Sequence, residues 1–253
     1  MKAMAKSGTL AVLAAGLLVV AWTQAGADVS ITACGQTVPD RETGTLAADL
    51  VCSSSASAVF VGDRATLDLD SHTITGEVQC VSSCTIVGPG EVGNTSFAAI
   101  YVNTSGAAGT KLVAQDLTVR NSAVGIYSQA LRLNLFTNVT ATQNSGAGIV
   151  VFGKANGTNV TVIDNGGPGF ASERKRVRFV GLTATGNGAG GLLNNGGRTR
   201  LVDSTLTGNT YPPFPGTPTL LDLFSFGRPK LVNTTCEHSF GPRDQPWGVC
   251  SLD

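Results

Sequence analysis

The sequence predicts an all-β solenoid, because one short phrase recurs about every 22 residues between Leu117 and Thr210. Each copy joins alternating apolar and threonine residues to an asparagine, and most copies continue to a glycine and an apolar residue. Helical repeats have longer periods, about 33 to 47 residues, so a coil of stacked strands fits the period better. The asparagines of the five copies keep this period to within one residue: Asn121, Asn144, Asn165, Asn187 and Asn209.

Alternation inside each copy predicts which side chains form the core. Apolar positions flank a β-branched threonine, as strands stacked at about 4.8 Å require. Each coil buries its apolar face only against its neighbours, so both ends of the stack need caps. The expected core columns are Leu117, Val139, Val160, Leu182 and Ser204; Val119, Ala141, Val162, Ala184 and Leu206; and Ile126, Ile149, Phe170, Leu192 and Phe214.

The repeated asparagines are expected at a turn between strands. Asparagine tolerates the left-handed backbone conformation better than most residues. Stacked at one turn, the side-chain amides can bond to one another along the solenoid, as they do in cross-β stacks. We therefore interpret these asparagines as architectural residues.

Residues 1–27 are expected to be a secretory signal peptide. Lys2 and Lys6 precede an apolar run, and the segment ends in small residues before Asp28. The apolar run of about 14 residues is shorter than the roughly 20 that a spanning helix needs. We therefore expect a secreted, periplasmic or extracellular protein with no membrane span after removal of the signal.

Six cysteines in the remaining chain indicate disulfides, because their number is even and export favours oxidation. Sequence alone allows 15 pairings. Without a CxxC motif and with only two histidines, zinc is not expected, and we predict no metal or other cofactor. The simplest pairing joins neighbours along the chain: Cys34 with Cys52, Cys80 with Cys84, and Cys236 with Cys250.

One domain of about 226 residues can bury a substantial core. We expect an N-terminal cap over residues 28–57, with a short helix over Arg41–Leu50. The coils follow over residues 58–235, and residues 236–253 form a C-terminal cap.

An insertion at 210–228 interrupts the coils, because its prolines cannot donate hydrogen bonds to a sheet. Its aromatic residues either cover the end of the core or form a wall of a sugar-binding groove. They are Tyr211, Phe214, Phe224 and Phe226.

The first coils carry the phrases LDLDSHTITG and TIVGPG, in which Leu67 and Leu69 alternate with Asp68 and Asp70. This pairing resembles the opening coils of right-handed parallel β-helix proteins, the pectin-lyase-like superfamily. The resemblance implies a single-stranded right-handed parallel β-helix of roughly eight coils with disulfide-reinforced caps. It also implies a structural, hydrogen-bonded role for His72. It leaves activity open, since the superfamily includes lyases, hydrolases, epimerases, adhesins and phage spikes.

Charge divides the chain. Residues 28–110 hold nine acidic and two basic residues, a net −7, and residues 111–253 hold eight acidic and thirteen basic residues, a net +5. In the basic half, cations recur with the period of the repeat, to within one residue: Lys111, Arg132, Lys154, Arg176 and Arg198. Arg178 and Arg200 form a second pair with the same spacing, and Arg174 lies beside them.

Such rows would stack at about 4.8 Å on one face, where like charges repel unless a polyanion neutralises them. A solvated face that discourages edge-to-edge aggregation is the alternative interpretation. Nucleic acid is not expected, because the rows lack aromatic residues. The partner that we expect is an acidic polysaccharide, held by Arg132, Lys154, Arg174, Arg176, Arg178, Arg198 and Arg200.

Catalysis stays open at this stage, and no catalytic residue is assigned. The motifs of polygalacturonase-type hydrolases in the resembled superfamily are absent, and Asp164, Glu173 and Asp203 are spread over different coils. A lyase needs a base and a cation to stabilise an enolate-like intermediate, roles that Lys154, Arg176 and Arg178 can fill. The alternative function is a non-catalytic cell-envelope or surface module with adhesive or structural duties.

A second group near His72 has two interpretations. His72 is either a general base or the structural residue that the resemblance implies. The carboxylates near it either bind a cation or are solvated strand positions: Asp63, Asp68, Asp70 and Glu77. We favour the structural interpretation of both. The sequence does not predict an oligomeric state.

Overall fold

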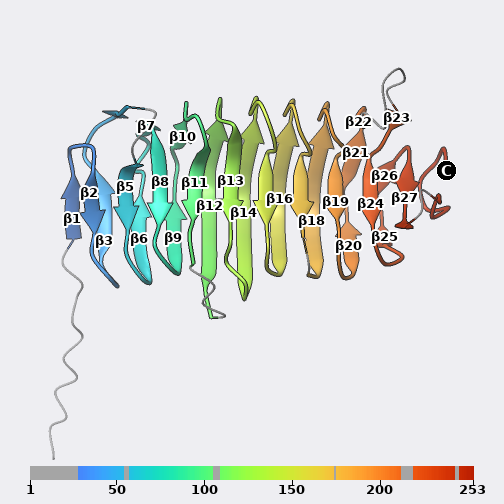
Figure 1. Ribbon diagram of the computed structural model, residues 1–253, viewed down its shortest axis with the longest axis horizontal. Coiled ribbons are helices and arrows are strands. Elements are labelled where there is room, and N and C mark those ends of the chain that lie inside the picture. Colours follow the sequence, from blue (N-terminus) through green and yellow to red (C-terminus); the bar gives the residue numbers. More distant parts are fainter. Residues whose placement is uncertain (1–27, 54–56, 105–108, 174, 212–218, 243–244) are drawn as a thin grey trace, which may run out of the picture.

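The computed structural model describes residues 28–53, 57–104, 109–173, 175–211, 219–242 and 245–253 (Figure 1). Its strands wind from one end of an elongated molecule to the other and stack in parallel, which confirms the predicted β-solenoid. The predicted signal peptide, residues 1–27, lies outside the described residues. Within the described part of the chain, no helix is long and apolar enough to cross a membrane.

Two sheets form the walls of the solenoid. The path through the first, sheet A, is β1 (Asp28–Ile31), β3 (Thr43–Leu46), β6 (Ala65–Asp68), β9 (Cys84–Val87), β12 (Lys111–Arg120), β14 (Leu133–Thr142), β16 (Ala155–Ile163), β18 (Val177–Thr185), β20 (Thr199–Val202) and β25 (Lys230–Val232). Shorter strands join sheet A beside this path: β4 (Leu50–Val51), β7 (Thr73–Thr75), β10 (Glu91–Gly93), β21 (Thr205–Thr207) and β26 (Thr235–Cys236).

The second sheet, sheet B, runs beside the first for the length of the molecule (Figure 1). Its order is β2 (Gln36–Val38), β5 (Ser57–Val61), β8 (Glu77–Cys80), β11 (Ala98–Val102), β13 (Val124–Ser128), β15 (Ile149–Val151), β17 (Phe170–Ser172), β19 (Leu192–Asn194), β24 (Leu223–Ser225) and β27 (Ser239–Phe240). The inward side chains of both sheets meet in one apolar core. The walls therefore leave their outer faces to solvent.

The long strands of sheet A bend at one residue in the left-handed conformation. Asp116 has a φ of 54°, and its stacked neighbours Asn138 and Asn159 have 51° and 52°. Because of the bend, side chains three residues apart both point into the core, as Ala114 and Leu117 of β12 do. Asn138 Nδ2 donates to Asp116 Oδ1 at 2.6 Å, so side chains at the bend also bond from coil to coil.

The core columns follow the predicted alternation. Leu117 pairs with Val139, which pairs with Val160 and then Leu182. A further inward column holds Phe136, Gly157 and Phe179 in register. Gly157 is required there, because a Cβ at this position would lie 2.2 Å from Cε1 of the Phe179 ring. Glycine on one coil thus makes room for the large ring on the next.

The asparagines form the predicted ladder, with one correction. Asn144, Asn165 and Asn187 each donate Nδ2 to Oδ1 of the next asparagine at 2.9, 2.9 and 2.8 Å. Asn209 donates to Oδ1 of the buried Asp222 at 2.8 Å, and Oδ2 of Asp222 accepts the N–H of Glu237 at 2.7 Å. The Asp222 carboxylate therefore ends the ladder by accepting the last amide hydrogen bond. All side chains of the ladder are buried.

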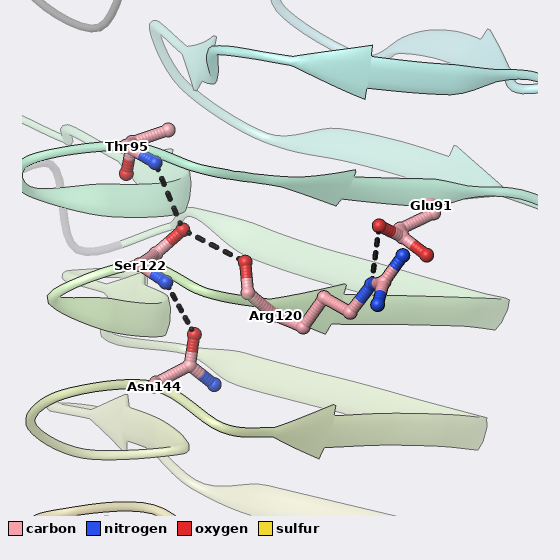
Figure 2. A network of polar contacts seen from close by, with 5 residues as sticks. All are labelled: Glu91, Thr95, Arg120, Ser122 and Asn144. Atoms are coloured by element: carbon pink, nitrogen blue, oxygen red, sulfur yellow. Dashed lines mark hydrogen bonds and ion pairs between the residues drawn. The ribbon is translucent and has the colours of Figure 1, made fainter.

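The ladder prediction is wrong for Asn121, which is exposed and outside the ladder, although its φ of 53° is the left-handed conformation that was predicted. Ser122 takes the position beside Asn144, and its N–H donates to Asn144 Oδ1 at 3.1 Å (Figure 2). Ser122 Oγ in turn accepts the N–H of Thr95 (Figure 2). Beside the ladder, the residues with left-handed backbone conformation include Gln143 and Asp164, each one position before a ladder asparagine. The turn therefore precedes the residue whose side-chain amide points inward.

The N-terminal segment continues the coils. β1 pairs with β3 and β3 with β6, while β2 pairs with β5, so the described residues 28–53 already stack in the register of the solenoid. The predicted helix over Arg41–Leu50 is wrong, because this segment contains β3 and the start of β4. Its TGTL stretch alternates half-buried and buried residues at the strand period.

All three neighbouring disulfides are confirmed: Cys34–Cys52, Cys80–Cys84 and Cys236–Cys250. Two of them tie down the terminal coils, where stacking is one-sided. Loop-closing links of this kind restrict the unfolded chain and stabilise the ends.

The insertion does not end the stack. After a short antiparallel pair, β22 (Thr210–Tyr211) with β23 (Thr219–Leu220), the chain returns to sheet B as β24. Leu223 pairs with Leu192 and fills the core position that we predicted for Phe214, a residue outside the described part. The ring centroids of Phe224 and Phe226 are 6.4 Å apart, and Phe226 is 55% exposed. Because coils continue beyond them, these rings do not cover the end of the core.

Candidate functional site

The basic residues gather on the outer face of sheet A near its C-terminal end. In β18, Arg178 is exposed between the buried Val177 and Phe179, so its side chain points outward. Arg178 pairs with Arg200, and Arg200 pairs with Lys230. These three cations therefore form one straight row across β18, β20 and β25.

A second row lies two residues earlier on the same coils. The backbone carbonyls of Lys154, Arg176 and Arg198 accept from successive coils at 2.7, 3.1 and 3.0 Å, which places the three residues in register. Arg228 precedes Lys230 by two residues and continues this row. Residues of both rows are exposed. We call the two rows the basic face: Lys154, Arg176, Arg178, Arg198, Arg200, Arg228 and Lys230.

Two predicted members lie outside these rows. Arg132 is exposed but stacks on Thr110, to whose carbonyl its N–H donates at 3.1 Å. Leu133 pairs with Lys111 and holds the row position on that coil. Arg132 follows Lys111 by one residue fewer than the period of the repeat, so it lies one position before the row. Arg174 lies outside the described residues.

The basic face is electrostatically uncompensated. Among the described residues, ion pairs join only Arg64 to Asp63, His72 to Asp49, and Arg120 to Glu91. Asp203 accepts instead from Asn233 Nδ2 at 3.0 Å, in a turn. Unit charges 4 Å apart in water repel by about 1 kcal/mol, and the coils stack at about 4.8 Å. A polyanion bound here would remove several such repulsions at once.

A shallow hollow adjoins the basic face on the outer side of β14, β16 and β18. It encloses about 260 Å³ and is lined by Leu135, Phe136, Thr137, Asn156, Gly157, Thr158, Arg178 and Val180. Arg178 thus belongs to both the hollow and the basic face. Sequence reasoning missed four neutral lining residues that occupy the outward columns in register with Arg178 and Val180: Leu135, Thr137, Asn156 and Thr158.

The group near His72 is a turn. His72 Nδ1 lies 3.3 Å from Asp49 Oδ1, which also accepts the N–H of Thr73 at 2.8 Å. The Thr73 N–H, and to a lesser extent His72, hold the pKa of the Asp49 carboxyl below its usual value. Throughout the described ranges, no three histidine, cysteine, aspartate or glutamate side chains converge as metal ligands. His72 is therefore hydrogen-bonded, as the structural interpretation expected.

No family model matches the chain, and no curated protein matches it. Among solved structures, the crystal structure of pectate lyase Pel9A is similar, with a TM-score of 0.37 and 14% sequence identity over 80% of this chain and 72% of that chain. A likeness at this level carries no argument about activity. The strand pairing itself defines the class of protein, a parallel β-solenoid, and the outer face of sheet A gives it a cationic surface.

Proposed function

We propose that this protein is exported and binds an acidic polysaccharide along the basic face. One observation carries the proposal: seven exposed cations occupy four successive coils of sheet A without a described carboxylate partner. Three disulfides fit an oxidising compartment, where such polymers are found.

The geometry suits a linear polyanion. Charges repeat at about 4.8 Å from coil to coil, and the two rows are about 6.6 Å apart along each strand. A polymer with a charge on every sugar can therefore contact several coils at once. Arginine adds bidentate hydrogen bonds to carboxylate or sulfate groups. The hollow beside Arg178 offers Asn156 and Thr158 to sugar hydroxyls.

The proposal concerns binding rather than turnover. In lyase-type cleavage a base removes the proton next to the uronate carboxyl group, and a cation stabilises the charge that develops. Cations are present, but within the described ranges no hydrogen bond or ion pair orients the side chain of any basic-face residue. Loosely held cations suit recognition of a flexible polymer more than positioned proton transfer.

The test is retardation in native gels that contain pectate, alginate or chondroitin sulfate, with dextran as the neutral reference. We expect the wild-type protein to be retarded by at least one acidic polymer, and less so at high salt because the charges are exposed. Removing two charges with Arg178→Gln and Arg200→Gln should weaken binding about 10-fold at low salt. Absorbance from unsaturated uronates, followed in the same samples, reports any cleavage.

The matched control removes two charges from the other half of the chain, with Arg41→Gln and Arg64→Gln. Both positions are exposed, and they come just before β3 and β6, which lie far along the stack from β18, β20 and β25 (Figure 1). Equal weakening by both double variants would show that only net charge matters. No retardation by any acidic polymer would overturn the proposal and favour the alternative, a non-catalytic structural or adhesive surface module.

A further inference from the structure

A cluster of aromatic rings lies on sheet B, away from the basic face of sheet A. Phe97 contacts Tyr101 and Tyr127 with ring centroids 5.2 and 5.6 Å apart. Tyr101 and Tyr127 are 5.9 Å apart, and Tyr127 lies 5.6 Å from Phe152. We call these four residues the aromatic cluster.

The aromatic cluster belongs to the outer face. Tyr101 pairs directly with Tyr127 in the register of β11 and β13, while their neighbours Ile100 and Ile126 are fully buried. Alternation in a strand therefore points both tyrosines outward. Phe97 is 45% exposed, and the other three rings are half-buried. Four rings gathered at the surface add little to the core and form an apolar platform facing water.

Hydrogen-bonding groups lie at one end of this platform. Gln79 pairs with Tyr101 in the same outward column. Ser57 Oγ lies 3.0 Å from Glu77 Oε1 and 2.9 Å from Gln79 Oε1. In the part of the chain that the structure describes, Glu77 Oε2 and Gln79 Nε2 have no hydrogen-bond partner. An acceptor and two amide hydrogens are thus left for a ligand.

The carboxyl group and the rings influence each other. Burial raises the pKa of the Glu77 carboxyl, against the effect of the Ser57 hydrogen bond. Burial also raises the pKa of the Tyr101 hydroxyl, with smaller contributions from Tyr127 and Glu77. The polar end and the tyrosine hydroxyls therefore belong to one partly desolvated surface.

This combination matches the chemistry of a pyranose ring. The C–H face of a sugar packs on an aromatic ring, and its hydroxyls both donate and accept hydrogen bonds, which suits a binding surface of aromatic rings with a few polar groups. Uronates do not fit, because Glu77 places a carboxylate beside the rings and residues 28–110 carry a net −7. We propose that the aromatic cluster, with Glu77 and Gln79, is a binding site for a neutral glycan.

The site is tested by native gels that contain galactan, xylan, glucomannan or mixed-linkage β-glucan, each compared with a polymer-free gel. We expect retardation by at least one of these four polymers, with little dependence on salt. Phe97→Ala should weaken that binding about 3- to 10-fold, because it removes one stacking surface. Phe97→Leu keeps the apolar volume without the flat ring and should weaken binding as well.

The control is Phe226→Ala, which removes an exposed phenylalanine from the far end of the solenoid. It should leave neutral-glycan binding unchanged. No retardation by any of the four polymers, or unchanged binding by both Phe97 variants, overturns the proposal. Sedimentation equilibrium tests whether the aromatic cluster binds a second copy of the chain instead. If the wild-type protein is dimeric, Phe97→Ala is monomeric and neither binds a glycan, the neutral-glycan proposal is also overturned.

This proposal is independent of the proposed function. The double variant Arg178→Gln with Arg200→Gln should keep full neutral-glycan binding while it loses acidic-polymer binding. The Phe97 variants should show the reverse. Each proposal can therefore fail alone.

Discussion

Asn187 is the position where the ladder makes its strongest prediction about stability. Its side chain is buried and joins four hydrogen bonds. Nδ2 donates to Asn209 Oδ1 at 2.8 Å and to the Val162 carbonyl at 2.9 Å. Oδ1 accepts from Asn165 Nδ2 at 2.9 Å and from the Asn165 N–H at 3.3 Å. Replacement by alanine removes all four and leaves no side-chain partner on that coil.

The expected cost follows from what is left unpaired. The Asn165 N–H and the Val162 carbonyl lose the bonds made by this side chain, and water cannot reach them readily. Each buried orphan costs about 1–3 kcal/mol, so Asn187→Ala should destabilise the fold by about 2–6 kcal/mol. For a chain of this size, that corresponds to a fall in Tm of roughly 10 °C.

The assay is thermal unfolding by circular dichroism with the disulfides intact, and the control is Asn121→Gly. Asn121 belongs to the same sequence repeat, but it is exposed and has a φ of 53°, which glycine adopts freely. We expect this control to stay within about 0.5 kcal/mol of wild type. An Asn187→Ala protein as stable as wild type, or a control equally destabilised, would refute the reasoning about the ladder.

Two further predictions concern packing and pH. Gly157→Ala places a methyl group 2.2 Å from the buried Phe179 ring, so the free energy of unfolding should fall by at least about 2 kcal/mol, whereas an unchanged unfolding midpoint would contradict the packing argument. Burial alone would raise the pKa of the Asp253 carboxyl, but hydrogen bonds from Ser239 and from the N–H groups of Cys250 and Val249 hold it below its usual value. Because the folded pKa is the lower one, this stabilisation is present above the unfolded pKa, near 3.9, and is lost as pH falls through the folded value. Asp253→Asn should therefore lower Tm at neutral pH and differ less from wild type as the pH falls below the unfolded pKa, and an equal difference under both conditions would contradict the assignment.

The basic face shows how far sequence reasoning reached for the site. Counting by the period of the repeat placed Arg176 with Arg198 and Arg178 with Arg200, and the strand register agrees. A similar count placed Arg132 in the row, where the register puts Leu133. A spacing reports register only when every turn between two residues has the same length. The coil from Lys111 to Leu133 spans 22 residues and the next, from Asn134 to Ala155, spans 21, and no local pattern marked the difference.

The aromatic cluster could not be found in this way. Its members do not share the period: Phe97 lies in a turn, Tyr101 and Tyr127 in strands, and Phe152 just after one. They meet because successive coils carry them to one outer surface. The hollow beside Arg178 has the same origin, since its lining comes from three strands.

The sequence by itself determined the solenoid, most of its core columns and the amide ladder from Asn144 to Asn209, whereas neighbour pairing of the cysteines was the simplest of 15 possibilities until the structure decided it. These features depend on local alternation and on a repeat that each coil satisfies in the same way. Only the tertiary structure decided which residues stack at irregular turns: Ser122 in place of Asn121, Leu133 in place of Arg132, and Leu223 in place of Phe214. The physical reason is that insertions of one or several residues are absorbed in turns, and only the pairing of strands on either side shows where the register resumes.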